Sequence, residues 1–242
     1  MENNHGLLEI KKGGNTFLKG DNMNYLRWCK SNMMFKHFHY GIVDPPYGIG
    51  VGDMNFGKSS KEEHENRTYE TGNWDNEVPT QEYWDLLWYC CQNVIVWGGN
   101  YFLKEWGRVT DNQGRMTGMP SGRCFFVWDK KKYDLDFADG EVALTTIDKN
   151  AKIIAKARNG KTDEFDGEKR HPTQKPVYVY DYIYTTLDIR NKRILDTHGG
   201  SMSHAVAAHR NMCNLTIIES MDSYFKSGVS NFEKAIAKGL LF

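Results

Sequence analysis

The chain has 242 residues, which is enough for one sizeable hydrophobic core, so we expect a single domain over 1–242. Hydrophobic residues make up 40% and charged residues 26%, and no apolar run approaches the about 18 residues of a membrane-spanning helix, which argues against a membrane protein. The formal net charge is zero, so any nucleic-acid surface must come from local clustering of basic residues. Since residues 1–12 hold no sustained apolar run, we expect no signal peptide and a cytoplasmic location.

Short runs of β-branched and aromatic residues alternate along the chain with longer helical patterns. This alternation predicts an α/β fold around a mainly parallel central sheet. In chain order, strands are expected over 40–44, 93–97, 124–129, 193–196 and 214–219. Helices are expected over 22–33, 80–91, 177–187, 203–210 and 221–238, and Thr80 is expected to cap the second of them.

Two stretches lack a helix or strand pattern. Residues 48–78 are rich in Gly, Asn, Lys and Glu, and a stretch of this length inside one domain predicts a mobile functional loop. Residues 108–123 are similar. The cysteines are odd in number and show no CxxC spacing, so we expect free thiols and no metal site at Cys29, Cys90, Cys91, Cys124 and Cys213.

The first segment with chemical meaning is Asp44-Pro45-Pro46-Tyr47, directly after an apolar strand end. The two prolines fix the backbone and remove two N–H donors, which gives a rigid turn with free carbonyl acceptors. The Asp44 carboxylate and the Pro45 carbonyl can each accept one hydrogen of an exocyclic amino group, and this makes the nitrogen more nucleophilic. Tyr47 can stack on a base turned out of the duplex. A plain proline-rich turn that closes a strand is the alternative.

A second segment lies near the C-terminus, where the strand 193–196 leads into a glycine-rich turn and a helix from Ser203. A strand, a glycine-rich turn and a helix N-terminus often form a nucleotide-binding unit, because glycine lets a ligand approach the backbone. Glu219 ends the next strand and can accept hydrogen bonds from ribose hydroxyls. The alternative is an ordinary βαβ turn with a solvated Glu219.

Together these segments resemble the β-group of DNA amino-methyltransferases, such as the orphan methylases of bacteria and bacteriophages. In that family the catalytic segment precedes the cofactor segment, which is a circular permutation of the usual order. The likeness runs collinearly over about 17–238 and rests on Lys19-Gly20-Asp21, the catalytic segment 40–50, Asn93 to Phe102, Phe126 to Lys130 and His171 to Pro176. It implies one Rossmann-like domain that uses S-adenosylmethionine (SAM).

The resemblance also implies roles for individual residues. Asp44, Pro45, Pro46 and Tyr47 would hold the target amine. The residues expected around SAM lie mostly in the cofactor segment 171–220, and they are Asp21, Thr173, Gln174, Lys175, Asp196, Gly199, Gly200, Ser201 and Glu219. Family members usually carry a second glycine where this chain has Met202, so we expect Met202 to crowd the methionine part of the cofactor.

DNA contacts are expected from a basic stretch over 147–170, the interval that carries target recognition in the family. Lys152, Lys156 and Arg158 are the predicted phosphate contacts, and Trp74 in the 48–78 loop is a predicted stacking residue. Five acidic residues share the basic stretch, so a mixed solvated loop is the alternative. A specific DNA interface buries about 1,000 Å² or more, and the shortness of this stretch therefore favours a homodimer.

The predicted function is methyl transfer from SAM to N6 of adenine in DNA, in the manner of restriction-modification or orphan methylases. The nearest rival is N4-cytosine methylation, because a cytosine amine offers the same two hydrogens. Asp before the two prolines favours adenine by family habit only. From another class, the chain could be a non-catalytic DNA-binding protein that retains the fold, a reading that Met202 favours.

Overall fold

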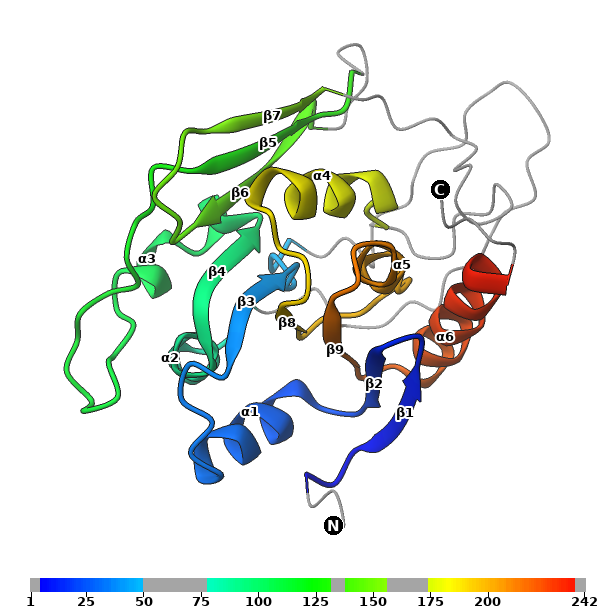
Figure 1. The fold of residues 1–242 in the computed structure, drawn as a ribbon. Coiled ribbons are helices and arrows are strands. Elements are labelled where there is room, and N and C mark those ends of the chain that lie inside the picture. Colours follow the sequence, from blue (N-terminus) through cyan, green and yellow to red (C-terminus); the bar gives the residue numbers. More distant parts are fainter. Residues whose placement is uncertain (1–4, 50–77, 132–137, 156–173, 238–242) are drawn as a thin grey trace.

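The computed structural model describes residues 5–49, 78–131, 138–155 and 174–237 (Figure 1). Within these ranges the strands are β1 Leu8–Lys12, β2 Asn15–Lys19, β3 Phe38–Val43, β4 Cys91–Trp97, β5 Phe125–Asp129, β6 Gly140–Thr145, β7 Lys152–Ala155, β8 Arg193–Asp196 and β9 Asn214–Glu219. The helices are α1 Asn22–Ser31, α2 Gln81–Cys90, α3 Leu103–Trp106, α4 Val177–Leu187, α5 Ser203–Arg210 and α6 Asp222–Ala237, with a 3₁₀ turn η3 at Gly99–Tyr101.

The described strands form one sheet in the order β1-β2-β9-β8-β3-β4-β6-β5-β7. The run from β2 through β9, β8 and β3 to β4 is parallel throughout, and β7 is parallel to β5. Antiparallel pairing occurs where β1 meets β2 and where β6 lies between β4 and β5. The prediction of an α/β fold with a mainly parallel sheet is therefore confirmed.

Two hydrophobic cores lie on the two faces of the sheet, because successive side chains of a strand point to opposite sides. On β3, Ile42 belongs to the core under α4, α5 and α6, while its neighbour Val43 belongs to the core under α1 and α2. Ile217 and Ile218 on β9 divide in the same way. The molecule thus has three layers, with helices covering both faces of the sheet (Figure 1).

Several predicted elements have the expected bounds, namely α4, α5, β8 and β9. The strands β1, β2, β6 and β7 were not predicted. The hairpin of β1 and β2 turns at Gly13 and Gly14, whose φ angles of 55° and 82° give the tight two-residue turn that a Gly-Gly pair favours. This glycine pair was a signal for the hairpin in the sequence.

Some local predictions were wrong. Thr80 occupies the N-cap position of α2, but its side chain makes no capping hydrogen bond. Cys91 was placed in the helix, whereas its extended backbone makes it the first residue of β4. Lys152, in the basic stretch, begins strand β7, which was not predicted.

The five cysteines are free and buried, as predicted. Residues 50–77 of the expected loop and 156–170 of the basic stretch lie outside the described residues. Among the helices that the structure describes, none is long and apolar enough to cross a membrane.

Candidate active site

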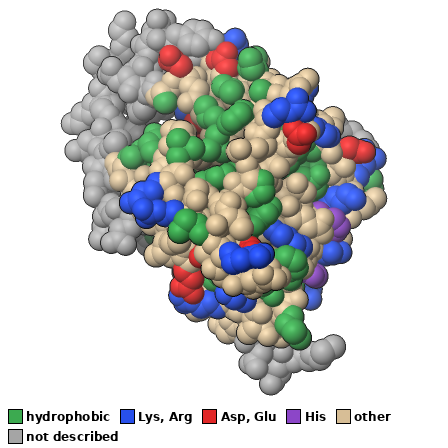
Figure 2. Space-filling view, turned by 90° about the vertical axis from the view of Figure 1, so that its left-hand side faces the viewer, with side chains coloured by type: hydrophobic (Ala, Val, Ile, Leu, Met, Phe, Trp, Pro, Cys, Tyr) green, Lys and Arg blue, Asp and Glu red, His purple; other side chains and the backbone are tan. Residues whose placement is uncertain are grey.

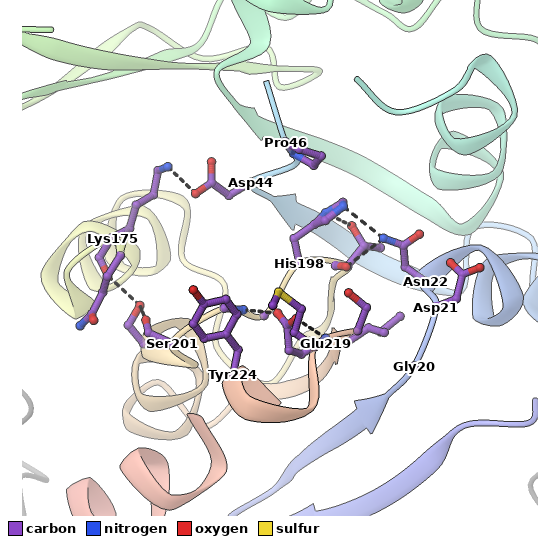
Figure 3. A pocket seen from close by; sticks show the side chains of 18 of the residues that line it. Gly20, Asp21, Asn22, Asp44, Pro46, Lys175, His198, Ser201, Glu219 and Tyr224 are labelled. Carbon is purple, nitrogen blue, oxygen red and sulfur yellow. Dashed lines mark hydrogen bonds and ion pairs between the residues drawn. The ribbon is translucent and has the colours of Figure 1, made fainter. Parts of the chain in front are cut away.

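A cavity of about 310 Å³ opens at the carboxyl ends of β2, β9, β8 and β3 (Figure 3). This is the edge at which open parallel sheets bind their ligands, because loops and helix N-termini converge there. Nine of the predicted site residues line it: Asp21, Asp44, Pro46, Gln174, Lys175, Gly199, Gly200, Ser201 and Glu219. Thr173 lies outside the described residues. Chain segments that are far apart in the sequence thus meet at one cavity.

Glu219 holds the glycine-rich turn in place. One of its carboxylate oxygens accepts the Gly200 N–H at 2.8 Å, and the other accepts the Met221 N–H at 2.8 Å. Burial raises the pKa of the Glu219 carboxyl, and the backbone N–H donors oppose that rise. The side chain therefore joins the ends of β8 and β9 and also presents an acceptor to the cavity.

The start of α1 forms the opposite wall of this half of the cavity. Asp21 is the N-cap of α1 and accepts the Met23 N–H at 2.8 Å. Asn22 donates to the Thr197 carbonyl at 3.2 Å and lies 3.1 Å from Nε2 of His198. Burial lowers the pKa of His198 to about 4, so its ring is neutral near pH 7. Asn22 was not predicted as a site residue.

Asp196 does not line the cavity, although it was predicted to bind the cofactor. Its Oδ2 lies 2.7 Å from Nδ1 of His204, and its Oδ1 accepts the His198 N–H at 3.0 Å. Nε2 of His204 lies 2.9 Å from the Tyr184 hydroxyl, and the imidazole ring of His204 stacks on Tyr180. Asp196 therefore belongs to a buried network beneath the half of the cavity that Glu219 and the glycine-rich turn form.

Met202 also lies away from the cavity, contrary to the prediction that it crowds the cofactor. It is fully buried and has a φ of 61° at the N-cap of α5. A Cβ atom on Gly228 of α6 would overlap Met202 Cγ, and one on Gly199 would lie 2.9 Å from Met202 Cε. The side chain therefore fills a niche between the turn and α6, which the missing side chain of Gly228 leaves open.

The other half of the cavity is built by charged side chains. Asp44, which follows β3, accepts from Lys175 Nζ at 2.5 Å (Figure 3). It also accepts from the Tyr47 hydroxyl at 2.7 Å. Lys175 Nζ also lies 2.9 Å from Oε2 of Glu141 on β6, and the second oxygen of Glu141 lies 2.7 Å from Lys130 Nζ. Lys175 was predicted to contact the cofactor, whereas its ammonium group lies between two carboxylates.

The charged side chains of this cluster shift one another's pKa values. Burial raises the pKa of the Asp44 carboxyl, Lys175 opposes the rise and Glu141 adds to it. Burial works against ionisation of Glu141, but Lys175 and Lys130 outweigh it and lower the pKa of that carboxyl to about 2. Burial likewise works against the charge of Lys175, yet Asp44 and Glu141 raise the pKa of its ammonium group. Near pH 7 the cluster therefore holds Glu141 as an anion and Lys175 as a cation.

Tyr47 lies against the glycines that follow β4. A Cβ atom on Gly98 would overlap the Tyr47 ring, and Gly98 has a φ of 63°, so both space and backbone require glycine here. The half-exposed ring of Tyr101 stacks on Tyr47 with 5.0 Å between centroids and 12° between planes. Pro45 is buried, and neither Pro45 nor Tyr47 lines the cavity in this conformation.

The predicted DNA contacts are mostly untested. Lys152 lies on the edge strand β7, whereas Trp74, Lys156 and Arg158 lie outside the described residues. On the face drawn in Figure 2, basic side chains are interspersed with acidic and hydrophobic ones. Among the described residues, no three His, Cys, Asp or Glu side chains are grouped so that they could hold a metal ion.

No protein-family model and no curated protein matches the chain. Among solved structures, M1.HpyAVI in complex with SAM is similar at a TM-score of 0.55 and 16% identity, over 90% of this chain and 98% of that one. The PvuII cytosine-N4-specific DNA methyltransferase is similar at a TM-score of 0.55 and 14% identity, over 92% of this chain and 90% of that one. TTHA0409 from Thermus thermophilus, named as a candidate DNA modification methylase, is similar at a TM-score of 0.51 and 11% identity. The match covers 90% of this chain and 94% of that one. These likenesses show that the chain has the α/β fold of SAM-dependent methyltransferases.

Proposed function

We propose that the chain is a SAM-dependent DNA methyltransferase that acts on N6 of adenine. The main support is that one cavity joins the glycine-rich turn and Glu219 to the Asp44 carboxylate. The first half suits a nucleoside with a methionine tail, and the second suits an amino group. The fold shared with M1.HpyAVI and the PvuII enzyme supports DNA methyl transfer without selecting the base, and the circularly permuted motif order that we infer from the sequence agrees with it.

The residues present fit SAM. The cavity volume of about 310 Å³ falls within the range of about 300 to 1,000 Å³ typical of small-ligand sites. Its lining includes the carboxylates of Asp21 and Glu219, which suit a ligand with a sulfonium, an ammonium group and ribose hydroxyls. When bound, SAM supplies an electrophilic methyl group. Glu219 would accept the ribose hydroxyls, and the turn at Gly199 and Gly200 would lie against the methionine part.

The protein's part in the reaction is to hold and activate the amine. Asp44 would accept one hydrogen of the exocyclic amino group and the Pro45 carbonyl the other, which directs the nitrogen lone pair out of the ring plane. The negative charge of Asp44 also stabilises the positive charge that grows on the nitrogen. Once the nitrogen is positively charged, its proton can leave to water, so no strong base is required.

Cytosine N4 is the second candidate acceptor. The PvuII enzyme is cytosine-N4-specific and matches the chain at the same TM-score as M1.HpyAVI. Asp44 would hold a cytosine amine in the same way. The alternative interpretation, a non-catalytic DNA-binding protein, rested on the expectation that Met202 crowds the cofactor. Met202 lies outside the cavity lining, so it no longer favours that interpretation.

The test is transfer of labelled methyl groups from SAM to DNA, followed by nucleoside analysis. We expect N6-methyladenine with the wild-type chain and none with Asp44→Ala. Glu233→Ala is the control, because Glu233 is a partly exposed carboxylate of α6 that pairs with Lys12 outside the cavity lining. N4-methylcytosine would change the substrate and keep the mechanism. Absence of methylated base with DNA of mixed sequence would refute the proposal.

DNA is the proposed partner, with a homodimer as a further prediction. Because the net charge is zero, local basic residues must hold the phosphates, so DNA affinity should fall steeply with salt. Charge reversal at Lys152, Lys156 and Arg158 should weaken DNA binding and leave SAM binding intact. Equal DNA affinity in that triple variant would move the interface to the 48–78 loop, which contains Trp74.

A further inference from the structure

We propose that Glu141 is a positioning residue that shares the Lys175 ammonium group with Asp44, so that Lys175 does not fully neutralise the carboxylate that accepts the target amine. Neither the sequence motifs nor the family resemblance points to Glu141. The proposal rests on the proposed function, since it concerns the same amine site. It starts from the position of the Lys175 ammonium group between two carboxylates.

Four separate parts of the fold build this cluster. Asp44 follows β3, Glu141 lies on β6, Lys130 follows β5, and Lys175 precedes α4. The Lys175 side chain is only 3% exposed, with Nζ 2.5 Å from Asp44, 2.9 Å from Glu141 and 5.1 Å from the centre of the Trp97 ring. A buried ammonium group with this many partners has a defined position, because leaving one partner would cost charge-assisted contacts.

Counting charges shows what Glu141 changes. With Asp44 and Lys175 alone, the carboxylate next to the amine is neutralised by the ammonium group 2.5 Å away. Glu141 places a second negative charge beside the same ammonium group, and Lys130 contacts the other oxygen of Glu141. With Asp44 ionised, these four side chains carry no net charge, but Asp44 stands at the end of the row and shares its one neighbouring cation with Glu141. The charge of Lys175 is therefore divided between two carboxylates, and an excess of negative charge remains on Asp44, at the amine site.

That excess bears on the reaction because positive charge moves onto the amine nitrogen during transfer. A neutral Asp44–Lys175 pair would stabilise this charge weakly, and a preorganised negative site stabilises it more. Glu141 also gives Lys175 a second acceptor when the amine arrives. Lys175 can then lean toward Glu141 as the amine takes up a hydrogen-bonding position on Asp44.

The decisive measurement follows the Asp44 carboxyl by carbon-13 NMR in protein labelled at aspartate, with Asp44→Asn to assign its signal. The charged or titratable groups that face Asp44 among the described residues are Lys175, Glu141, Tyr47 and, more remotely, Lys130 and Tyr180. Removing a like charge lowers a carboxyl pKa, so Glu141→Gln should lower the Asp44 titration midpoint by about one pH unit. Lys130→Gln removes a cation and should raise the Asp44 titration midpoint.

Kinetics then link this coupling to catalysis. Glu141→Gln should lower kcat about tenfold or more and shift the acidic limb of the rate profile to lower pH, with SAM affinity unchanged within about twofold. Glu141→Asp should restore part of kcat. Lys130→Gln should shift the acidic limb to higher pH, and this partly exposed side chain serves as the second variant if Glu141→Gln does not fold.

The two proposals fail in different ways. The NMR titration needs neither DNA nor methyl transfer. A wild-type chain that methylates no DNA refutes the proposed function, whereas an active chain in which Glu141→Gln leaves the Asp44 titration and kcat unchanged refutes the role of Glu141 alone. A loss of kcat with an unmoved titration, not restored by Glu141→Asp, means that Glu141 is merely structural.

Discussion

The two halves of the cavity are built in different ways. In the half proposed to bind SAM, the cofactor half, main-chain groups make most of the contacts, as when Glu219 accepts the N–H groups of Gly200 and Met221. In the half proposed to bind the target amine, the acceptor half, side chains contact side chains, and Asp44, Tyr47, Lys175 and Glu141 balance one another's charges. A backbone-built half should control affinity, whereas a charge-built half should control rate and its pH dependence. The predictions below test this division.

Asp44→Ala should have the largest effect. It should lower methyl transfer by more than about 100-fold, because the acceptor of the amine hydrogen and its negative charge are both lost. Asp44→Asn should retain little activity, since it keeps an acceptor oxygen without the charge. The fold should persist because Lys175 keeps Glu141 as a partner. Labelled-methyl transfer measures the loss and calorimetry measures SAM affinity, which should stay the same. Full activity in Asp44→Ala would refute the mechanism.

Glu219→Ala should weaken SAM binding about ten- to a hundred-fold, because a charged hydrogen-bonded contact contributes about 1.5 to 3 kcal/mol. It also frees two backbone N–H groups, so some of the loss reflects a looser turn. Glu219→Gln keeps one acceptor oxygen, so its SAM affinity should lie between those of the wild type and Glu219→Ala. Calorimetric titration measures each affinity. Unchanged SAM affinity in Glu219→Ala would remove this residue from the cofactor site.

Tyr47→Ala should weaken activity on DNA through loss of stacking, a contact of about 1 to 3 kcal/mol in other nucleic-acid complexes. Tyr47→Phe should restore most of that loss. It still removes the donor that lies 2.7 Å from Asp44, so its pH–rate profile should differ from that of the wild type even where its DNA affinity does not. Identical profiles would mean that the hydroxyl plays no part in the charge cluster.

The smallest expected effect at neutral pH concerns a residue that matters for acid stability. His198 has a folded pKa lowered from 6.5 to about 4, so the unfolded chain takes up its proton first, and stability falls as pH drops through this window. His198→Gln should remove that loss, of the order of 3 kcal/mol by pH 4, in urea unfolding between pH 4 and 6.5. Glu141 differs, since its stabilisation is present above pH 4.5 and is lost as pH falls toward about 2. Equal slopes for wild type and His198→Gln would contradict the burial of a neutral His198.

Local patterns determined much of the fold and of the cofactor half. A strand, a glycine-rich turn and a helix follow one another from Arg193 to Arg210, so neighbours in sequence fix their geometry, and both elements lie at the predicted bounds. The same holds for the acidic end of β9 at Glu219. The rigid turn at Asp44 could also be predicted from the sequence, because two prolines restrict the backbone whatever surrounds them.

The tertiary structure alone decided where the longer side chains point. Lys175 and Glu141 meet because β6 inserts antiparallel between β4 and β5, a pairing between residues far apart in sequence. Met202 turns away from the cavity because Gly228 on α6 leaves room for it, and Asp196 turns inward to His204. Strand ends, turns and prolines are local properties of the chain, whereas a buried charge or a flexible side chain takes its place from partners that only the packed fold brings within reach.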